Sequence, residues 1–386
     1  MRLMQFIIFF GIVLTVYTLL NYYIFSRGLR TFEPGSALRT FYIVGFWALA
    51  ATFILGRVLE KIYLSHLSDF FTWTGSFWLA AMLYLFLAVV AIDIVRLINH
   101  FVSFFHHFEG IIWMQKPYLI TVFVSVVVFL SVLVGHLNAL NPRIKEININ
   151  TGTKSMHGKS LRLVMASDVH LGTIISKKRL TKYVKLINEL KPEAVLFAGD
   201  ILDEDLAPVI KQNLGDLLNT IDAPLGVYGT TGNHEYIGGA SRAIEYLSGH
   251  GIKMMGDTMT QLVDNVYLAG REDIESVRFA GKTRKKLDSF TGSRPHDSYL
   301  IVLDHQPRAI PEAVDAGVGL LLSGHTHHGQ MWPLNYITQA AFPVSWGLKK
   351  FEKTNVYVSS GLGSWGPPVR IGNKPEIVVI TLMFDE

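Results

Sequence analysis

The sequence predicts an α/β protein in two parts, an N-terminal transmembrane region of four helices and a layered α/β domain. Charged side chains number 66 (35 basic, 31 acidic), and residues 1–136 hold only 13 of them, which leaves 53 for residues 137–386. Long apolar stretches are confined to the first part, whereas the second alternates short apolar segments with polar, helix-like ones. The charged share of 17% is below the roughly 25% of soluble domains, which also favours a membrane region.

Four apolar stretches in the first part have the roughly 17–25 residues needed to cross a bilayer as a helix. Aromatic residues such as Tyr22, Trp73 and Tyr118 lie near their ends, where amphipathic rings favour the membrane interface. The first stretch is too long for a signal peptide and no small-residue cleavage site follows it, so we expect an uncleaved anchor. The expected spans are residues 4–24, 40–56, 70–92 and 118–135, followed by a linker at 137–160.

Four spans, an even number, place both termini on one side of the membrane. With the N-terminus inside, six basic residues flank the inner ends of the spans and five flank the outer ends. This small excess favours a cytoplasmic C-terminal domain. Asp93, three residues before Arg96, is the one ionisable residue close to the interior of a span. Anchoring is therefore a better interpretation of these helices than a pore or a transporter.

Residues 161–386 have the pattern of a layered α/β domain with sheets at its centre. Continuous Val/Ile/Leu runs that end in Gly, Asp or His indicate strands buried on both faces. Between them, residues 176–190 and 240–251 have helical spacing. The expected strands are residues 161–167, 193–199, 225–232, 266–270, 299–305, 319–325, 355–361 and 376–384.

Polar side chains follow five of these strands. In sheets flanked by helices, ligands collect beyond the carboxyl ends of strands, so these side chains are expected to converge. A single Asp after a strand is often a helix cap, and a single His is often a hydrogen-bonded polar residue. Five strand ends that all supply such groups are a different case, because burying them together is costly without a cation. The residues are Asp168, His170, Asp200, Asp203, Asn233, His234, Glu235, His305, His325 and His327.

The mixture of imidazole and carboxylate favours Mn²⁺, Fe²⁺ or Zn²⁺ over Ca²⁺ or Mg²⁺. There are too many donors for one ion, and two ions about 3.5–4 Å apart that share one carboxylate would use them all. In the segment "HTH", His325 and His327 lie on one face of an extended chain and can reach neighbouring metals. The chain has no cysteine, which excludes disulfides, thiolate catalysis and Cys-ligated metals.

The motifs "DVH" (168–170), "GDILD" (199–203), "GNHE" (232–235), the isolated His305 and "GHTH" (324–327) occur in this order. These motifs and their order resemble those of the calcineurin-like metallophosphoesterase superfamily. The tail "SSGLGSWGPPVRIGNKPEIVVITL" is similar to the membrane-anchored bacterial branch, which also includes transmembrane proteins with this domain. The resemblance covers residues 161–382 and implies an α/β-β/α sandwich that hydrolyses phosphoesters.

Carried over position by position, the resemblance implies two metal ions. The first would be held by Asp168, His170, Asp200 and His327. The second would be held by Asp200, Asn233, His305 and His325, with Asp200 as the bridge.

Other residues near these motifs are assigned less directly. His234 would hydrogen-bond the phosphoryl oxygen or protonate the leaving group, and Asp203 and Glu235 would orient histidines. His328 departs from the Gly that is frequent in related branches; it could narrow the pocket, contact substrate or lie at the rim. Arg271 would contact a phosphate or form a surface salt bridge with Glu272 or Asp273.

The resemblance implies a hydrolase with two divalent cations, Mn²⁺ being the expected metal and Fe²⁺ or Zn²⁺ the alternatives. Attachment to a bilayer favours a lipid-linked substrate, for example as a UDP-2,3-diacylglucosamine pyrophosphate hydrolase of lipid A synthesis at the cytoplasmic face of a bacterial inner membrane. The alternatives are a broader phosphodiesterase or phosphatase on lipid or nucleotide substrates, and a non-catalytic binding protein, which the complete ligand set disfavours. Nucleic acid is not an expected partner, because the longest basic run, "KTRKK" (282–286), is short.

Overall fold

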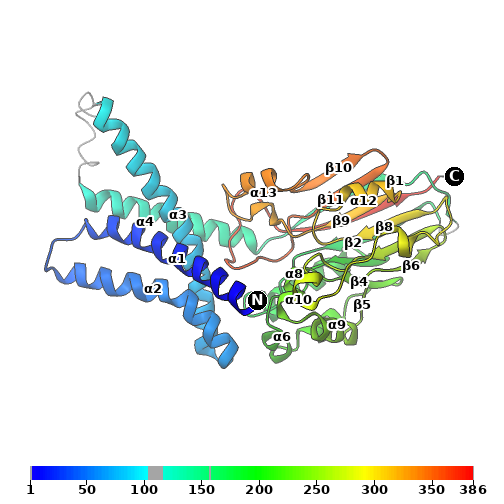
Figure 1. Ribbon diagram of the computed structural model, residues 1–386, viewed down its shortest axis with the longest axis horizontal. Helices are drawn as coiled ribbons and strands as arrows, with labels where there is room; N and C mark the ends of the chain where they lie inside the picture. Colours follow the sequence, from blue (N-terminus) through cyan, green and yellow to red (C-terminus); the bar gives the residue numbers. More distant parts are fainter. Residues whose placement is uncertain (1, 103–115, 156–157, 386) are drawn as a thin grey trace. The chain divides into compact units, whose positions relative to one another are not determined.

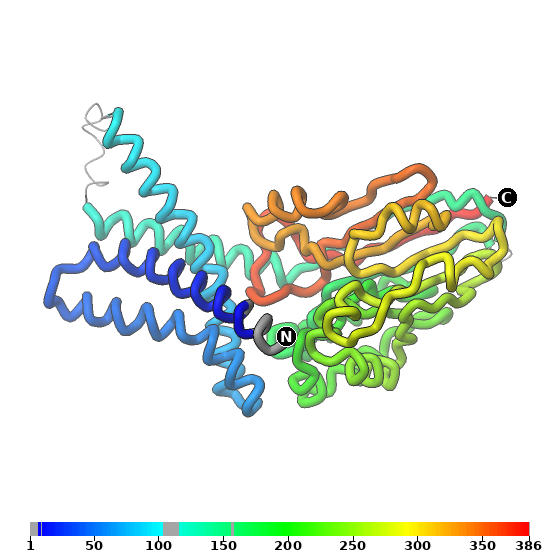
Figure 2. Tube along the Cα trace, viewed as in Figure 1, coloured from blue at the N-terminus to red at the C-terminus, as the bar shows by residue number. Residues whose placement is uncertain are grey.

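The computed structural model describes residues 2–102, 116–155 and 158–385, and the chain divides into two units, Met1–Gly135 and His136–Glu386 (Figures 1 and 2). Within its described residues, the first unit contains helices and no strand. They are α1 (Arg2–Leu29), α2 (Ala37–Ile62), α3 (His66–Val102) and the larger part of α4 (Pro117–Ala139).

Helices α2 and α3 pack closely because small residues line their contact. A Cβ added at Gly75 would lie 2.4 Å from the Cα of Phe53, and one at Gly56 would lie 2.8 Å from the backbone N of Thr72. Such close backbone approach through small residues is typical of helix pairs in membranes.

Three helices among the described residues are long and apolar enough to cross a membrane, not the four that we predicted: α2, α3 and α4. The first predicted span does form a helix, α1, which is not among these three. The side chains of residues 4–6 and 9 of this predicted span lie outside the described part. The prediction that both termini lie on one side depended on an even number of spans, and it loses that basis.

The second unit contains two six-stranded mixed sheets, which confirms the predicted mixed α/β character. In each sheet four neighbouring strands run parallel to one another, β2, β3, β4 and β5 in the first and β7, β8, β9 and β11 in the second. The first sheet has the order β1 (Arg143–Asn150), β12 (Glu376–Met383), β2 (Ser160–Ala166), β3 (Ala194–Ala198), β4 (Gly226–Thr230) and β5 (Ile252–Met254). The second has the order β10 (Gly347–Phe351), β11 (Thr354–Val358), β9 (Leu320–Ser323), β8 (Tyr299–Leu303), β7 (Val266–Gly270) and β6 (Thr258–Val263).

Alternate side chains of each sheet enter different cores, as the period of a strand requires. In β2, Leu163 belongs to a core that also holds Leu268 and Ile301 of the second sheet. Its neighbour Val164 belongs to a core shared with Leu180 of α5 (Lys177–Glu189) and with α9 (Ala240–Gly249). A third core lies between the second sheet and α12 (Ile310–Asp315). In Figure 1, α6 and α9 lie on one side of the strands and α13 on the other.

All eight predicted strands are present, and both predicted helices form as α5 and α9. The predicted linker differs, because its residues 143–150 form β1, which pairs in parallel with β12. The segment "RIKEININ" alternates apolar and polar residues, and its exposed positions suit the edge of a sheet. Strands β5, β6 and β10 were not predicted. The remaining helices are short: α6 (Ala207–Lys211), α7 (Leu214–Leu218), α8 (Asn233–Gly238), α10 (Ser276–Ala280), α11 (Asp288–Thr291) and α13 (Asn335–Ala341).

Candidate metal centre

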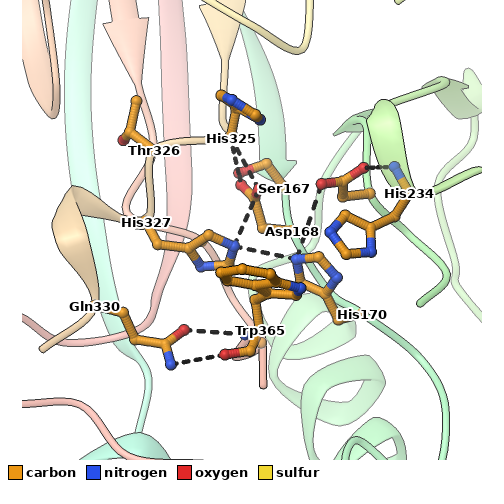
Figure 3. Close-up of polar contacts among 12 residues, drawn as sticks. Ser167, Asp168, His170, His234, His325, Thr326, His327, Gln330 and Trp365 are labelled. Atoms are coloured by element: carbon orange, nitrogen blue, oxygen red, sulfur yellow. Dashed lines mark hydrogen bonds and ion pairs between the residues drawn. The ribbon is translucent and has the colours of Figure 1, made fainter. Parts of the chain in front are cut away.

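The carboxyl ends of β2, β3, β4, β8 and β9 bring the predicted metal-ligating side chains together (Figure 3). Parallel strands end at the same edge of their sheet, so the loops that follow them meet there. Asp168 and His170 follow β2, and Asp200 and Asp203 follow β3. The first residues of α8 follow β4, His305 follows β8, and His325 and His327 follow β9.

A first set of donor atoms comes from Asp168, His170, Asp200 and His327. The Nε2 atoms of His170 and His327 lie 3.1 Å apart. Asp168 Oδ1 lies 3.5 Å from His327 Nε2, and Asp200 Oδ2 lies 3.9 Å from His170 Nε2. Figure 3 shows Asp168, His170 and His327 directed toward one another.

A second set comes from Asp200, Asn233, His305 and His325. His305 Nε2 lies 3.0 Å from Asp200 Oδ2 and 3.3 Å from Asn233 Oδ1. His325 Nδ1 lies 2.8 Å from the same asparagine oxygen. Both sets therefore include one atom, Oδ2 of Asp200.

The surroundings of three of these histidines suit cations at these positions. His305 Nδ1 lies 2.8 Å from the carbonyl oxygen of Ala198, and its Nε2 faces the Asp200 carboxylate at 3.0 Å. Burial acts to lower the pKa of His305, but Asp200 raises it well above its ordinary value. A cation between them satisfies both groups. Burial lowers the pKa of His325 to about 3, helped by the nearby His305, and burial with His170 lowers that of His327. The neutral imidazole is the form that binds a metal.

Neighbouring groups hold the two buried carboxylates in place. Asp168 Oδ2 accepts a hydrogen bond of 2.5 Å from Ser167 Oγ, and Asp168 Oδ1 accepts one of 2.9 Å from the backbone N–H of His325. Asp200 Oδ1 accepts one of 2.9 Å from the backbone N–H of His234, so its Oδ2 points to the two donor sets. Burial acts to raise the pKa of Asp200, but His305 and His234 hold it well below its ordinary value, in the ionised form that binds a cation.

The backbone is strained where these side chains are presented. Five of the seven predicted ligands lie in the left-handed region, with φ between 46° and 70°. Each non-glycine residue in this conformation costs on the order of 1–3 kcal/mol, and such strain is typical of functional sites. The five are Asp168, His170, Asp200, His325 and His327.

The motif glycines are needed because backbone passes against the ligand carboxylates. A Cβ at Gly232 would lie 2.1 Å from Asp200 Oδ1, and one at Gly324 would lie 2.3 Å from Asp168 Oδ2. A side chain at either position must displace a ligand.

We expect Gly232→Ala to weaken Mn²⁺ binding by about 10–100-fold, because the added methyl group moves the shared carboxylate of Asp200. Calorimetric titration of the purified chain with Mn²⁺ measures this. Gly249→Ala is the matched control, since no described atom lies within 4 Å of the Cβ that it adds. Unchanged Mn²⁺ affinity in Gly232→Ala would contradict the inference that a side chain at position 232 displaces the Asp200 carboxylate.

His234 lies beside the two donor sets and is held by Asp203. Its Nδ1 lies 3.2 Å from Asp203 Oδ1, and His170 Nδ1 lies 3.8 Å from the same oxygen. Burial acts to lower the pKa of His234, but Asp200 and Asp203 raise it to about 9. An imidazole in this position can donate a proton or a hydrogen bond.

Glu235 contacts backbone rather than the histidines we expected it to orient. Its carboxylate accepts hydrogen bonds from the N–H groups of Asp200 (3.1 Å), Leu202 (2.9 Å) and Gly232 (2.7 Å). Glu235 therefore ties the loop after β3 to the start of α8, and burial raises its pKa to about 6.

Two other predicted site residues, Arg271 and His328, contact side chains that belong to neither donor set. Arg271 is buried and pairs with Glu312 at 2.6 Å, so it is not a surface partner of Glu272 or Asp273. His328 Nδ1 lies 3.1 Å from Ser345 Oγ, and its ring lies 5.4 Å from that of Trp346.

Arg370 and Asn373, in the tail after β11, were not predicted as site residues. The guanidinium of Arg370 is fully buried and donates to the carbonyl oxygens of Ser360 (2.5 Å) and Gly363 (2.6 Å). Its Nη2 lies 3.2 Å from His327 Nδ1. Asn373 Nδ2 donates to the carbonyl oxygen of His327 at 3.1 Å. The only sequence signal for the contacts of Arg370 and Asn373 with His327 was an arginine in a Gly/Pro-rich loop.

Comparison with known proteins agrees with this geometry. The family model described as calcineurin-like phosphoesterase matches residues 161–329. An uncharacterized metallophosphoesterase of Bacillus subtilis is 31% identical over 265 residues, which are 64% of this chain and 89% of that protein. An uncharacterized metallophosphoesterase of Campylobacter jejuni is 29% identical over 396 residues and covers 98% of this chain and 99% of its own length.

A relative in Danio rerio is a transmembrane protein with metallophosphoesterase domain. It is 31% identical over 278 residues, which are 68% of this chain. The match spans only 62% of the length of that relative.

Proposed function

The chain belongs to the calcineurin-like metallophosphoesterases, and from this we propose that it is a membrane-anchored hydrolase of phosphodiester or pyrophosphate bonds that uses two divalent cations. The observation that carries the proposal is the shared position of Asp200 Oδ2, 3.0 Å from His305 Nε2 of one donor set and 3.9 Å from His170 Nε2 of the other. The family's α/β-β/α layer order is part of the proposal, and the core common to both sheets supports it.

We assign the first cation to Asp168, His170, Asp200 and His327, and the second to Asp200, Asn233, His305 and His325. Two such cations, when bound, supply Lewis acidity that lowers the pKa of water and neutralises charge at phosphorus. The mixed nitrogen and oxygen donors suit Mn²⁺, Fe²⁺ or Zn²⁺, and we propose Mn²⁺.

The chain's own residues orient the reaction. His234 Nδ1 lies 3.2 Å from Asp203 Oδ1, so the Nε2 on the other side of the ring faces away from that carboxylate. From there Nε2 can donate to a phosphoryl oxygen or to the leaving oxygen, and so stabilise charge that grows during bond cleavage. Asp203 holds the ring in this orientation, and Glu235 holds the backbone that carries Asp200.

We propose a lipid-linked substrate because three helices of the same chain are suited to cross a membrane. A hydrolase held at the bilayer meets a lipid-borne phosphoester without extracting it into water. UDP-2,3-diacylglucosamine is the specific candidate, which requires the second unit to face the cytoplasm of a bacterial cell.

The full chain, purified in detergent, stripped with a chelator and reloaded with Mn²⁺, is expected to hydrolyse bis(p-nitrophenyl) phosphate and to release UMP from UDP-2,3-diacylglucosamine. Activity should disappear on chelation and return with Mn²⁺. Hydrolysis of the chromogenic diester without release of UMP would exclude the lipid A candidate and leave the broader phosphodiesterase. Loading of about two metals per chain with no hydrolysis of either compound would indicate a binding protein instead.

A further inference from the structure

The first unit contains a cavity of about 570 Å³ between its four helices. This volume lies within the range of roughly 300–1,000 Å³ that is typical of small-molecule sites. Every lining residue lies between Ile24 and Ser125, so the cavity is separate from the metal centre, which is built from residues of the second unit.

Most of the cavity wall is hydrocarbon and aromatic. Helix α2 contributes Phe46 and Leu49, and α3 contributes Trp78, Leu85 and Val89. Gly45 of α2 also lines the cavity, and no described atom lies within 4 Å of a Cβ built there. A wall of this kind suits an acyl chain and gives no reason to admit a small hydrophilic ion.

The lining also includes a group of charged residues from the C-terminal end of α1, the turn after it, and α3. Asp93 Oδ2 lies 2.7 Å from Arg27 Nη2 and accepts a hydrogen bond of 2.6 Å from Tyr23. Arg96 Nη1 lies 3.6 Å from Asp93 Oδ1, and Arg30 also lines the cavity. Three arginines and one aspartate leave two positive charges in the lining uncompensated.

The buried Nε of Arg27 has no hydrogen-bond partner within the described part of the chain. An unsatisfied guanidinium nitrogen beside excess positive charge is suited to an anion with several acceptor oxygens, and arginine binds phosphate through paired N–H donors. A neutral lipid leaves these charges unmatched, and a free phosphate leaves the apolar wall unmatched.

We propose that this cavity binds one anionic phospholipid, with its phosphate at Arg27, Arg30 and Arg96 and an acyl chain along the wall formed by α2 and α3. The site does not depend on the hydrolase function, because none of its residues belongs to the metal centre. It makes the helices of the first unit a lipid-recognition element in addition to an anchor.

Native mass spectrometry of the full chain tests the proposal, after exchange into detergent with either phosphatidylglycerol or phosphatidylcholine at equal concentration. The wild-type chain is expected to retain one phosphatidylglycerol and at least tenfold less phosphatidylcholine. Gly45→Leu fills the cavity with a side chain and should lose the bound lipid. Gly11→Leu is the matched control: Gly11 is in α1, does not line the cavity, and no described atom lies near its Cβ.

The double variant Arg30→Gln/Arg96→Gln should lose the preference for phosphatidylglycerol while Asp93 keeps its contact with Arg27. Retention of the lipid by Gly45→Leu at the wild-type level would overturn the cavity assignment. Equal retention of the two lipids by the wild-type chain would overturn the role of the arginines. Metal content and phosphoesterase activity, measured on the same samples, report separately on the second unit.

Discussion

Asp200→Asn is expected to lower phosphoesterase activity by more than about 100-fold, beyond the 10–100-fold typical of residues that only support metal ligands. The reason is the position of one atom, because Oδ2 of Asp200 belongs to both donor sets. An amide removes the negative charge that two neighbouring cations would share and places N–H₂ or a neutral oxygen there. The metal content, measured by inductively coupled plasma mass spectrometry, should fall from about two per chain to one or none.

Asp222→Asn is the matched control for this change. Asp222 is exposed in the loop before β4, and its side chain takes no part in the metal centre. The control should keep both activity and metal content. Two metals and full activity in Asp200→Asn would refute the proposed centre, whereas two metals without activity would place Asp200 in the chemistry alone.

Arg370→Met is expected to lower the free energy of unfolding of the second unit by about 3–5 kcal/mol, because it leaves buried polar groups without their donor. The guanidinium is fully buried and donates to the carbonyl oxygens of Ser360 and Gly363, and its Nη1 also contacts Asn373 Oδ1 at 3.1 Å. Methionine fills similar space but donates nothing. Burial already lowers the pKa of Arg370 to about 10, so the protein retains a costly charge at this position for the contacts it makes.

Urea unfolding of the detergent-solubilised full chain, followed by tryptophan fluorescence, measures this effect. Arg242→Met, an exposed position on α9, is the control and should leave the unfolding midpoint unchanged. Mn²⁺ affinity should also fall in Arg370→Met, since the guanidinium packs against His327. A variant as stable as the wild type would show that other donors or water satisfy the Ser360 and Gly363 carbonyls.

The strands could be predicted from the sequence for a physical reason, and so could the convergence of the polar residues that follow them. Strands buried on both faces are continuous apolar runs, and the parallel ones end at one edge of the sheet, so residues as distant as Asp168 and His327 could be placed together. Their roles as metal ligands remain a prediction that the distances support.

The parts that sequence could not supply depend on contacts without a local pattern. Arg370 acts on carbonyl groups of a loop that has no periodicity, and Glu235 binds backbone N–H groups rather than a side chain. Strand β1 was mistaken for linker because its partner, β12, lies 233 positions further along the chain, as in the pair Arg143 and Glu376. Of the four predicted membrane spans, the one in α1 forms a helix that is not among the three candidate spans of the described residues.

Strand β12 lies between β1 and β2 in the first sheet, parallel to one and antiparallel to the other. Figure 2 shows this last, red part of the chain running through the second unit. During synthesis on the ribosome, the sheet that presents Asp168 and Asp200 therefore stays open until residues 376–383 have left the exit tunnel, long after the N-terminal helices have been made. A chain truncated before Glu376 is therefore expected to form its N-terminal helices but to lack phosphoesterase activity.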